Sequence, residues 1–160
     1  MEKEGVEMQL KGKKVIILGE RDGIQGQAIA ACVKSAGADP LLVQTQCFVW
    51  TAAGGIDLDG QESIKKVIDE HGKDNLVVII GAPDADSAEL YAETVVHGDP
   101  AWAGPLAGIS LGLPVFHIME PEIIAQIDPE VYNEHLSLME IALDVEKIAE
   151  GLNRVRSKSS

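Results

Sequence analysis

The stretch NLVVIIG, residues 75–81, decides the fold of this chain. It contains five consecutive aliphatic residues, a pattern typical of a strand that is buried on both faces of a parallel sheet. Three further runs resemble it: KKVIILG at 13–19, DPLLVQT at 39–45 and LPVFHI at 113–118. We therefore expect these four segments to form the strands of a mostly parallel sheet.

Helical patterns separate the expected strands. An apolar stripe indicates a first helix that stops at Gly37, and a second helix is expected to begin with a capping box formed by Asp59 and Glu62 and to stop at Gly72. Asp128 is suited to cap the last helix, since Pro129 follows it in the first turn. The expected helices cover residues 25–35, 61–71, 85–96 and 130–152, with a short helix opened by Pro121. The last helix is expected to bury Val131, Leu138, Met139, Ala142, Leu143 and Ile148.

Strands that alternate with helices predict the fold class. We expect a single α/β domain over residues 11–152, with a mostly parallel, flavodoxin-like sheet flanked by helices. A flexible N-terminal segment, 1–10, and a frayed tail, 153–160, are expected to flank this domain.

The charge balance limits the possible partners. The chain has 26 acidic and 13 basic side chains, which give a formal net charge of −13. Such a surface repels phosphate backbones and anionic lipids, so we expect neither nucleic acid nor membrane as a partner. The first residues are charged and lack the apolar stretch of a secretory signal, which leads us to expect a cytoplasmic protein.

Three loops are expected to meet where the strands end, because chemistry in open parallel sheets gathers beyond the carboxyl ends of the strands. They are GERDGIQG at 19–26, QCFVWTAAGGIDL at 46–58 and GAPDAD at 81–86. Cys47 lies in the second loop. From the residues alone, it is explained equally well as a reactive thiolate and as a partly buried inert thiol.

Other candidate sites have simpler explanations. The loop 19–26 lacks the endings of phosphate-binding motifs, and Glu20 and Asp22 would repel a phosphate, so we interpret it as a tight strand-to-helix connection. Cys32 falls on an apolar helical stripe and is expected to be a core residue. Trp102 is interpreted as an anchor of its loop.

The four histidines do not have the spacing of a metal site. They are His71, His97, His117 and His135. We therefore expect no metal and no separate cofactor.

Several motifs together resemble a known family. They are KKVIILGERDGIQG at 13–26, QCFVWTAAGGIDLDG at 46–60, HGDPAWAGPLAGISLGLPVFHIMEPE at 97–122 and the acidic last helix. The chain resembles protein A of the glycine, sarcosine and betaine reductase complexes, a small selenoprotein of amino-acid-fermenting anaerobes, from about Lys11 to Gly151. In that family the second motif reads Cys-Phe-Val-selenocysteine-Thr-Ala-Ala-Gly. Here Trp50 occupies the selenocysteine position.

The genetic code suggests a reason for this substitution. Selenocysteine is encoded by UGA, one nucleotide away from the tryptophan codon UGG. Our hypothesis is that Trp50 marks a selenocysteine codon that was translated, or replaced, as tryptophan.

The resemblance implies an oxidoreductase component. In the family, protein B passes a carboxymethyl group to the selenium, and protein C takes up the two-carbon unit and releases acetyl phosphate. The neighbouring cysteine then closes on the selenium as a selenenylsulfide, which thioredoxin reduces. Carried over, Cys47 is the resolving thiol and position 50 the nucleophile, so the form with Trp50 is expected to be inactive. Protein B selects the substrate, hence the chain itself is compatible with glycine, sarcosine or betaine.

Two alternatives remain open. Trp50 is genuine in the first, and the chain is a non-catalytic binding or scaffold module of the same fold. In the second, the chain is an ordinary thiol protein that depends on Cys47.

Overall fold

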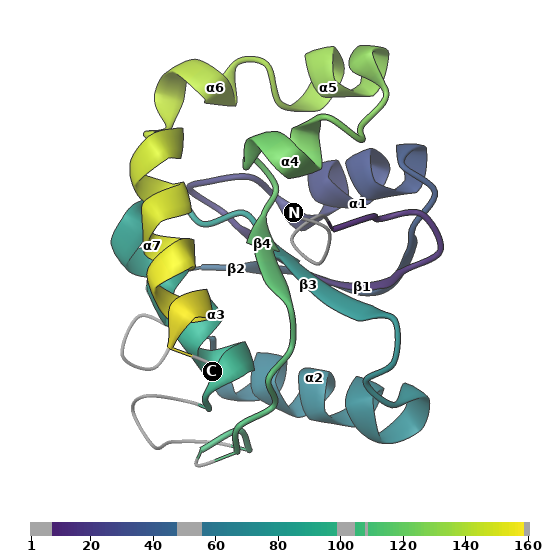
Figure 1. The fold of residues 1–160 in the computed structure, drawn as a ribbon, viewed down its shortest axis with the longest axis vertical. Coiled ribbons are helices and arrows are strands. Elements are labelled where there is room, and N and C mark those ends of the chain that lie inside the picture. Colours follow the sequence, from purple (N-terminus) through teal and green to yellow (C-terminus); the bar gives the residue numbers. More distant parts are fainter. Residues whose placement is uncertain (1–7, 48–55, 99–104, 108, 159–160) are drawn as a thin grey trace.

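A four-stranded parallel sheet forms the centre of the computed structural model, which describes residues 8–47, 56–98, 105–107 and 109–158 (Figure 1). The strand order is β2-β1-β3-β4. It follows the flavodoxin-like order, in which the second strand lies at one edge and the first strand beside it. The predicted fold class is thereby confirmed. The strands are β1 (Lys14–Glu20), β2 (Asp39–Gln46), β3 (Leu76–Ile80) and β4 (Val115–His117).

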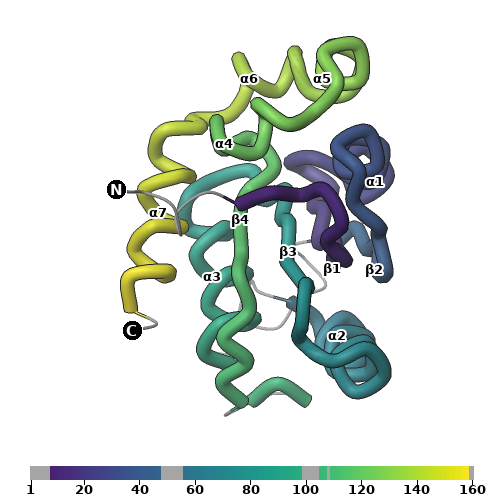
Figure 2. Tube along the Cα trace, turned by 45° about the vertical axis from the view of Figure 1, so that its right-hand side comes forward, coloured from purple at the N-terminus to yellow at the C-terminus, as the bar shows by residue number. Residues whose placement is uncertain are grey.

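Helices cover both faces of this sheet, and the strand sequences explain why. Every residue of β3 is buried, and successive side chains enter two separate hydrophobic clusters, so both faces must be covered. Helices α2, α3 and α7 contribute side chains to one cluster and α1 and α4 to the other. Figure 2 shows how these helices are placed around the strands. The helices are α1 (Gly26–Ser35), α2 (Leu58–His71), α3 (Ala85–Val96), α4 (Pro121–Ile124), α5 (Pro129–His135), α6 (Met139–Ala142) and α7 (Val145–Ser157). Among the described residues, none of the helices has the length and apolar character needed to cross a membrane.

Most helix ends were predicted from local chemistry. Gly37 and Gly72 follow α1 and α2 with φ angles of 89° and 77°, which glycine adopts without strain. Asp128 accepts a hydrogen bond from the backbone of Glu130 at 2.9 Å and caps α5 as expected. The predicted cap of α2 is wrong, because α2 begins earlier and its cap is Asp57, which accepts from the Gly60 N–H at 2.6 Å.

The prediction of one long last helix is also wrong. The chain forms three helices there, because Leu143 has an extended backbone (φ −106°, ψ 147°) and ends α6. Asp144 then caps a new helix, α7, by accepting from the Lys147 N–H at 3.2 Å. Leu138 and Ala142, expected in the core, are exposed. A capping aspartate inside an amphipathic pattern starts a new helix without disturbing the spacing of the apolar residues.

The described parts of the two ends pack against the rest of the domain. Leu10 is fully buried, and its N–H donates to the side chain of Gln126 at 2.7 Å. The N–H of Met8 donates to Glu122 at 2.8 Å. At the other end, α7 continues to Ser157, and Val155 is buried. Residues 1–7 and 159–160 lie outside the described residues.

Candidate functional site

Cys47 lies immediately after β2, at the carboxyl edge of the sheet, and its side chain is half-buried. The parallel register places Glu20 beside Gln46, so the residues that follow these two must be neighbours. The Arg21 N–H donates to the Gln46 carbonyl at 2.8 Å, and Arg21 Nη1 is 3.8 Å from Cys47 Sγ. A permanent positive charge therefore lies next to the sulfur, where it would stabilise a thiolate in a reaction.

The other predicted site residue, Trp50, lies outside the described residues, as does Trp102. The described part of the site consists of the chain on either side of these segments. It includes Cys47 before the gap at 48–55 and Ile56 after it.

Two glutamines, Gln46 on β2 and Gln61 on α2, hold the residues that follow the segment 48–55. Gln46 Oε1 accepts from the Asp57 N–H at 3.3 Å. Gln61 is fully buried in the first turns of α2; its Nε2 donates to the Ile56 carbonyl at 3.0 Å, and its Oε1 accepts from the Leu106 N–H at 3.0 Å. Gln61 thus connects the residues that follow 48–55 with those that follow 99–104. The sequence analysis did not identify Gln61 as a site residue. The local feature that indicates its role is a polar side chain at a helix position that faces the core.

Several carboxylate side chains lie close to the carboxyl ends of the strands. Glu20, the last residue of β1, is 1% exposed and accepts a hydrogen bond from the Asp22 N–H at 2.6 Å. Burial raises the pKa of Tyr91 well above its ordinary value, and the nearby carboxylates of Glu20, Asp57 and Asp84 add to this effect. So much negative charge disfavours a phosphate ligand.

The loop 19–26 is the tight connection that the sequence indicated. Gly23 packs directly on the end of β3, since a Cβ atom added there would lie 2.2 Å from the Gly81 carbonyl oxygen. The Gly23 N–H donates to the Glu20 carbonyl at 3.0 Å, which closes the turn. The loop therefore has no room for a ligand between it and the third strand.

The two cysteines differ in their surroundings. Cys32 is fully buried in α1, and burial raises its pKa to about 11, so this thiol stays protonated. This agrees with the predicted core role. Cys47 is accessible and lies beside Arg21.

Alkylation of the folded protein at about pH 8 is expected to modify Cys47 and to spare Cys32, because only the accessible thiolate reacts. At low salt, Arg21→Met should slow the reaction of Cys47 by roughly three- to fivefold, since an adjacent positive charge is worth on the order of 1 kcal/mol near a surface. Peptide mass mapping over time measures both rates. Arg154→Met, which removes a charge from α7, is the matched control; an equal effect of the two substitutions would contradict a local role of Arg21.

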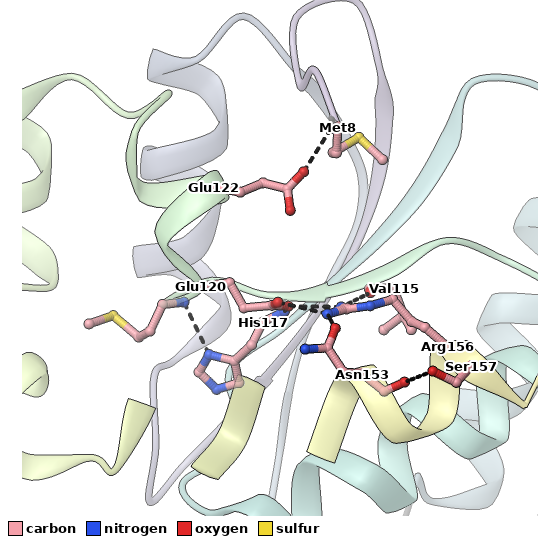
Figure 3. A network of polar contacts seen from close by, with 9 residues as sticks. Met8, Val115, His117, Glu120, Glu122, Asn153, Arg156 and Ser157 are labelled. Carbon is pink, nitrogen blue, oxygen red and sulfur yellow. Dashed lines mark hydrogen bonds and ion pairs between the residues drawn. The ribbon is translucent and has the colours of Figure 1, made fainter. Parts of the chain in front are cut away.

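His117 ties two strand ends together. It is fully buried at the end of β4, where its Nε2–H donates to the Ala82 carbonyl at 2.8 Å. Its Nδ1 accepts from the Met119 N–H at 3.1 Å, the contact drawn at the ring in Figure 3. These partners require a neutral ring. Burial lowers the pKa of His117 to about 4, although the hydrogen bond to Ala82 and the charge of Glu120 act in the opposite direction.

Stability is expected to depend on pH through His117. Between the ordinary pKa of 6.5 and about 4, the unfolded chain binds a proton that the folded protein does not, so stability falls as pH falls through this window. Urea unfolding should show that the wild-type protein loses about 3 kcal/mol more than His117→Gln between about pH 7 and pH 4. His71→Gln, at an exposed position, should keep the wild-type pH dependence. Identical curves for wild type and His117→Gln would contradict this assignment.

Next to His117, a partly buried ion pair joins α7 to the chain that follows β4. Arg156 Nη1 and Nη2 contact the two carboxylate oxygens of Glu120 at 3.0 and 2.9 Å (Figure 3). Arg156 also donates to the Val115 carbonyl at 2.9 Å and lies 4.8 Å from the ring centre of Phe116. Glu120 in turn accepts from the His117 N–H at 2.9 Å. The described residues contain no group of three or more His, Cys, Asp or Glu side chains that could hold a metal ion.

The fold and site define a flavodoxin-like α/β protein with an accessible cysteine beside an arginine at the carboxyl edge of the sheet. The comparisons with known proteins identify its family. The family of glycine reductase complex selenoprotein A matches residues 10–156, and the chain belongs to this family.

Curated relatives match over nearly their whole length. The glycine/sarcosine/betaine reductase complex component A of Symbiobacterium thermophilum is 55% identical over 151 residues, which cover 94% of this chain and 97% of the relative. That of Carboxydothermus hydrogenoformans is 54% identical with the same coverage. Component A1 of Peptoclostridium acidaminophilum is 51% identical over 92% of this chain and 93% of its own. No solved structure matches the chain significantly.

Proposed function

We propose that this chain is the carrier subunit of a cytoplasmic glycine, sarcosine or betaine reductase. A selenium nucleophile at position 50 receives a carboxymethyl group from protein B and holds it as a selenoether. Protein C then takes the two-carbon unit as an acetyl thioester and releases acetyl phosphate. The observation that carries the proposal is the similarity to component A proteins along nearly the whole chain, including the Cys47 segment.

Cys47 acts in this scheme as the resolving thiol. When the selenium–carbon bond breaks, the methylene carbon keeps the bonding electron pair and takes up a proton to become a methyl group. The selenium is thereby oxidised and forms a bond to the Cys47 sulfur, whose thiol releases one proton and so balances the step. The dithiol of thioredoxin returns two electrons and regenerates the selenol and the thiol. Accessibility at the sheet edge and the positive charge of Arg21 support this role, since both favour thiolate chemistry.

Tryptophan at position 50 is the feature that the proposal must explain. An indole has one N–H donor and no ionisable nucleophile, so it cannot accept the carboxymethyl group. We propose that selenocysteine is the native residue there. Selenium is suited to the task because a selenol is more acidic and more polarisable than a thiol, and is therefore both a nucleophile and a leaving group.

The nucleotide triplet at position 50 of the source gene tests this proposal. UGA is the expected triplet, and the intact mass of the protein from its own organism should then include one selenium atom. An authentic UGG would contradict selenium chemistry in this chain. It would favour the non-catalytic binding module, especially if the genes for the other reductase subunits are absent from the neighbourhood.

A further inference from the structure

Arg21 differs in charge from the other residues at the carboxyl edge of the sheet. The described residues that lie between each strand and the next helix are 21–25, 47, 56–57, 81–84 and 118–120. Arg21 is the one basic side chain in these described connections. The acidic side chains there are Asp22, Asp57, Asp84 and Glu120. A permanent cation at an otherwise acidic edge suggests that it binds an anion.

The guanidinium of Arg21 has no competing carboxylate partner among the described residues. Its side chain is exposed, and none of the ion pairs between described residues includes it. The neighbouring Glu20 is buried. Asp57 and Asp84 instead accept N–H groups near the starts of α2 and α3. The side-chain contact of Arg21 in the described structure is with the Cys47 sulfur.

The backbone holds Arg21 beside this sulfur. The Arg21 N–H donates to the Gln46 carbonyl at 2.8 Å. The turn that follows is closed by the Gly23 N–H, which donates to the Glu20 carbonyl at 3.0 Å. Because Nη1 lies 3.8 Å from Cys47 Sγ, a carboxylate joined to the sulfur through one methylene group is within reach of the guanidinium. The two groups can then form two parallel hydrogen bonds, each about 2.8 Å long.

The group that is carried in the proposed function has this chemistry. A carboxymethyl group ends in a carboxylate, which the acidic side chains of this edge repel. In that scheme the selenium at position 50 bonds to Cys47 in each cycle, so the group it carries must be accommodated near the Cys47 sulfur. The charge of Arg21 offsets the repulsion there.

We propose that Arg21 is a substrate-binding residue, whose guanidinium binds the carboxylate of the carboxymethyl group and selects this group over neutral alkyl groups of the same size. A monoanion suits one guanidinium, whereas a phosphate dianion would be repelled more strongly by the surrounding carboxylates. The identity of the bound group rests on the proposed function. The preference for a carboxylate rests on the position of Arg21 beside Cys47.

Two alkylating reagents that differ only at one end test this binding on the full chain. Iodoacetate delivers a carboxymethyl group, and iodoacetamide delivers the neutral amide of the same shape. With either reagent the Cys47 sulfur bonds to the methylene carbon, iodide leaves with the bonding electron pair, and the thiol proton goes to solvent. Peptide mass mapping over time gives the rate at Cys47. The ratio of the two rates isolates the carboxylate, because an effect of Arg21 on the thiolate changes both rates equally.

Arg21→Met is expected to lower the ratio of the iodoacetate rate to the iodoacetamide rate by about fivefold at low salt, the usual effect of a charge pair near a surface. Arg21→Lys keeps the charge but lacks the paired donors, so it should retain only part of the preference. Arg154→Met, which removes an exposed cation from α7, is the matched control and should leave the ratio unchanged. All three variants should keep the wild-type unfolding midpoint, because both arginines have exposed side chains.

The carboxymethylated protein provides a second measurement. The carboxyl group attached to Cys47 should have a lower pKa in the wild-type chain than in Arg21→Met, because an adjacent positive charge favours the ionised form. NMR of an isotope-labelled carboxyl carbon follows this titration. The measurement reports contact in the product, which attraction of the free reagent does not affect.

Each other outcome has a definite meaning. An unchanged rate ratio in Arg21→Met, or equal carboxyl pKa values in the two proteins, overturns the assignment of Arg21. A ratio in Arg21→Lys equal to that of the wild type overturns binding through paired donors. Transfer from protein B to the selenocysteine form of Arg21→Met at the wild-type rate overturns the substrate-binding role while the proposed function stands. If the selenocysteine form with Arg21 accepts no carboxymethyl group, the proposed function fails, and the reagent ratio still decides whether Arg21 binds a carboxylate.

Discussion

The form with tryptophan at position 50 is expected to gain no carboxymethyl group when it is mixed with protein B and substrate, whereas the selenocysteine form gains one. The expected difference is all or none, because an indole has no ionisable nucleophile at working pH. Intact-mass analysis of the chain after the reaction distinguishes the two results. Detection of the adduct on the Trp50 form would refute the proposed role of this position.

Three variants separate transfer from redox chemistry. Trp50→Cys should form a reducible disulfide with Cys47 but transfer the carboxymethyl group poorly, because an unperturbed thiol is mostly protonated at neutral pH. Trp50→Ser, of similar size but without redox chemistry, should do neither. In the selenocysteine form, Cys47→Ser should still accept one carboxymethyl group but fail to be regenerated by thioredoxin. Repeated turnover of that variant would contradict the role of Cys47 as the resolving thiol.

Arg156→Met is expected to lower the free energy of unfolding by about 3 kcal/mol at neutral pH, the lower end of the cost of breaking a buried ion pair, because the Arg156 side chain is 25% exposed. The Glu120 side chain is 7% exposed and would remain in the interior without its counter-charge. The variant also loses the hydrogen bond to the Val115 carbonyl and the contact with the Phe116 ring. Urea denaturation measures the loss.

Arg154→Met is the matched control for this experiment. Arg154 lies on α7 like Arg156 and pairs with Glu89 of α3, but its side chain is 59% exposed, so its removal should leave stability nearly unchanged. The double variant Glu120→Gln/Arg156→Met should regain part of the loss, because it leaves no charge without a partner. Equal losses for Arg156→Met and Arg154→Met would show that burial of the Glu120–Arg156 pair has no special importance.

Local patterns predicted the sheet well. The run at 75–81 became β3 at Leu76–Ile80, and the other three runs became β1, β2 and β4, because uninterrupted aliphatic stretches suit strands that are covered on both faces. The helix over 85–96 was predicted with its bounds, since Asp84 marks its start. Such features depend on residues that are close in sequence.

Features that depend on distant residues were not predicted. Glu120 and Arg156 are 36 positions apart, and Gln61 and Leu106 are 45 apart, so no local pattern reveals these contacts. The breaks between α5, α6 and α7 were missed because the spacing of apolar residues continues across them.

The candidate site follows the same rule. The position of Cys47 at the sheet edge could be predicted from the end of a single strand. Its contact with Arg21 could not, because it requires β1 and β2 to be neighbours in register. The exposure of Leu138 was likewise hidden, since this residue has the spacing of a core residue.

The buried amide of Gln61 gives the protein a mechanical link. One planar group holds the backbone at Ile56 through its nitrogen and the backbone at Leu106 through its oxygen. A shift of either backbone segment rotates or strains that plane, and the other segment experiences the change. The buried amide of Gln61 therefore sets the spacing between the backbone at Ile56 and the backbone at Leu106.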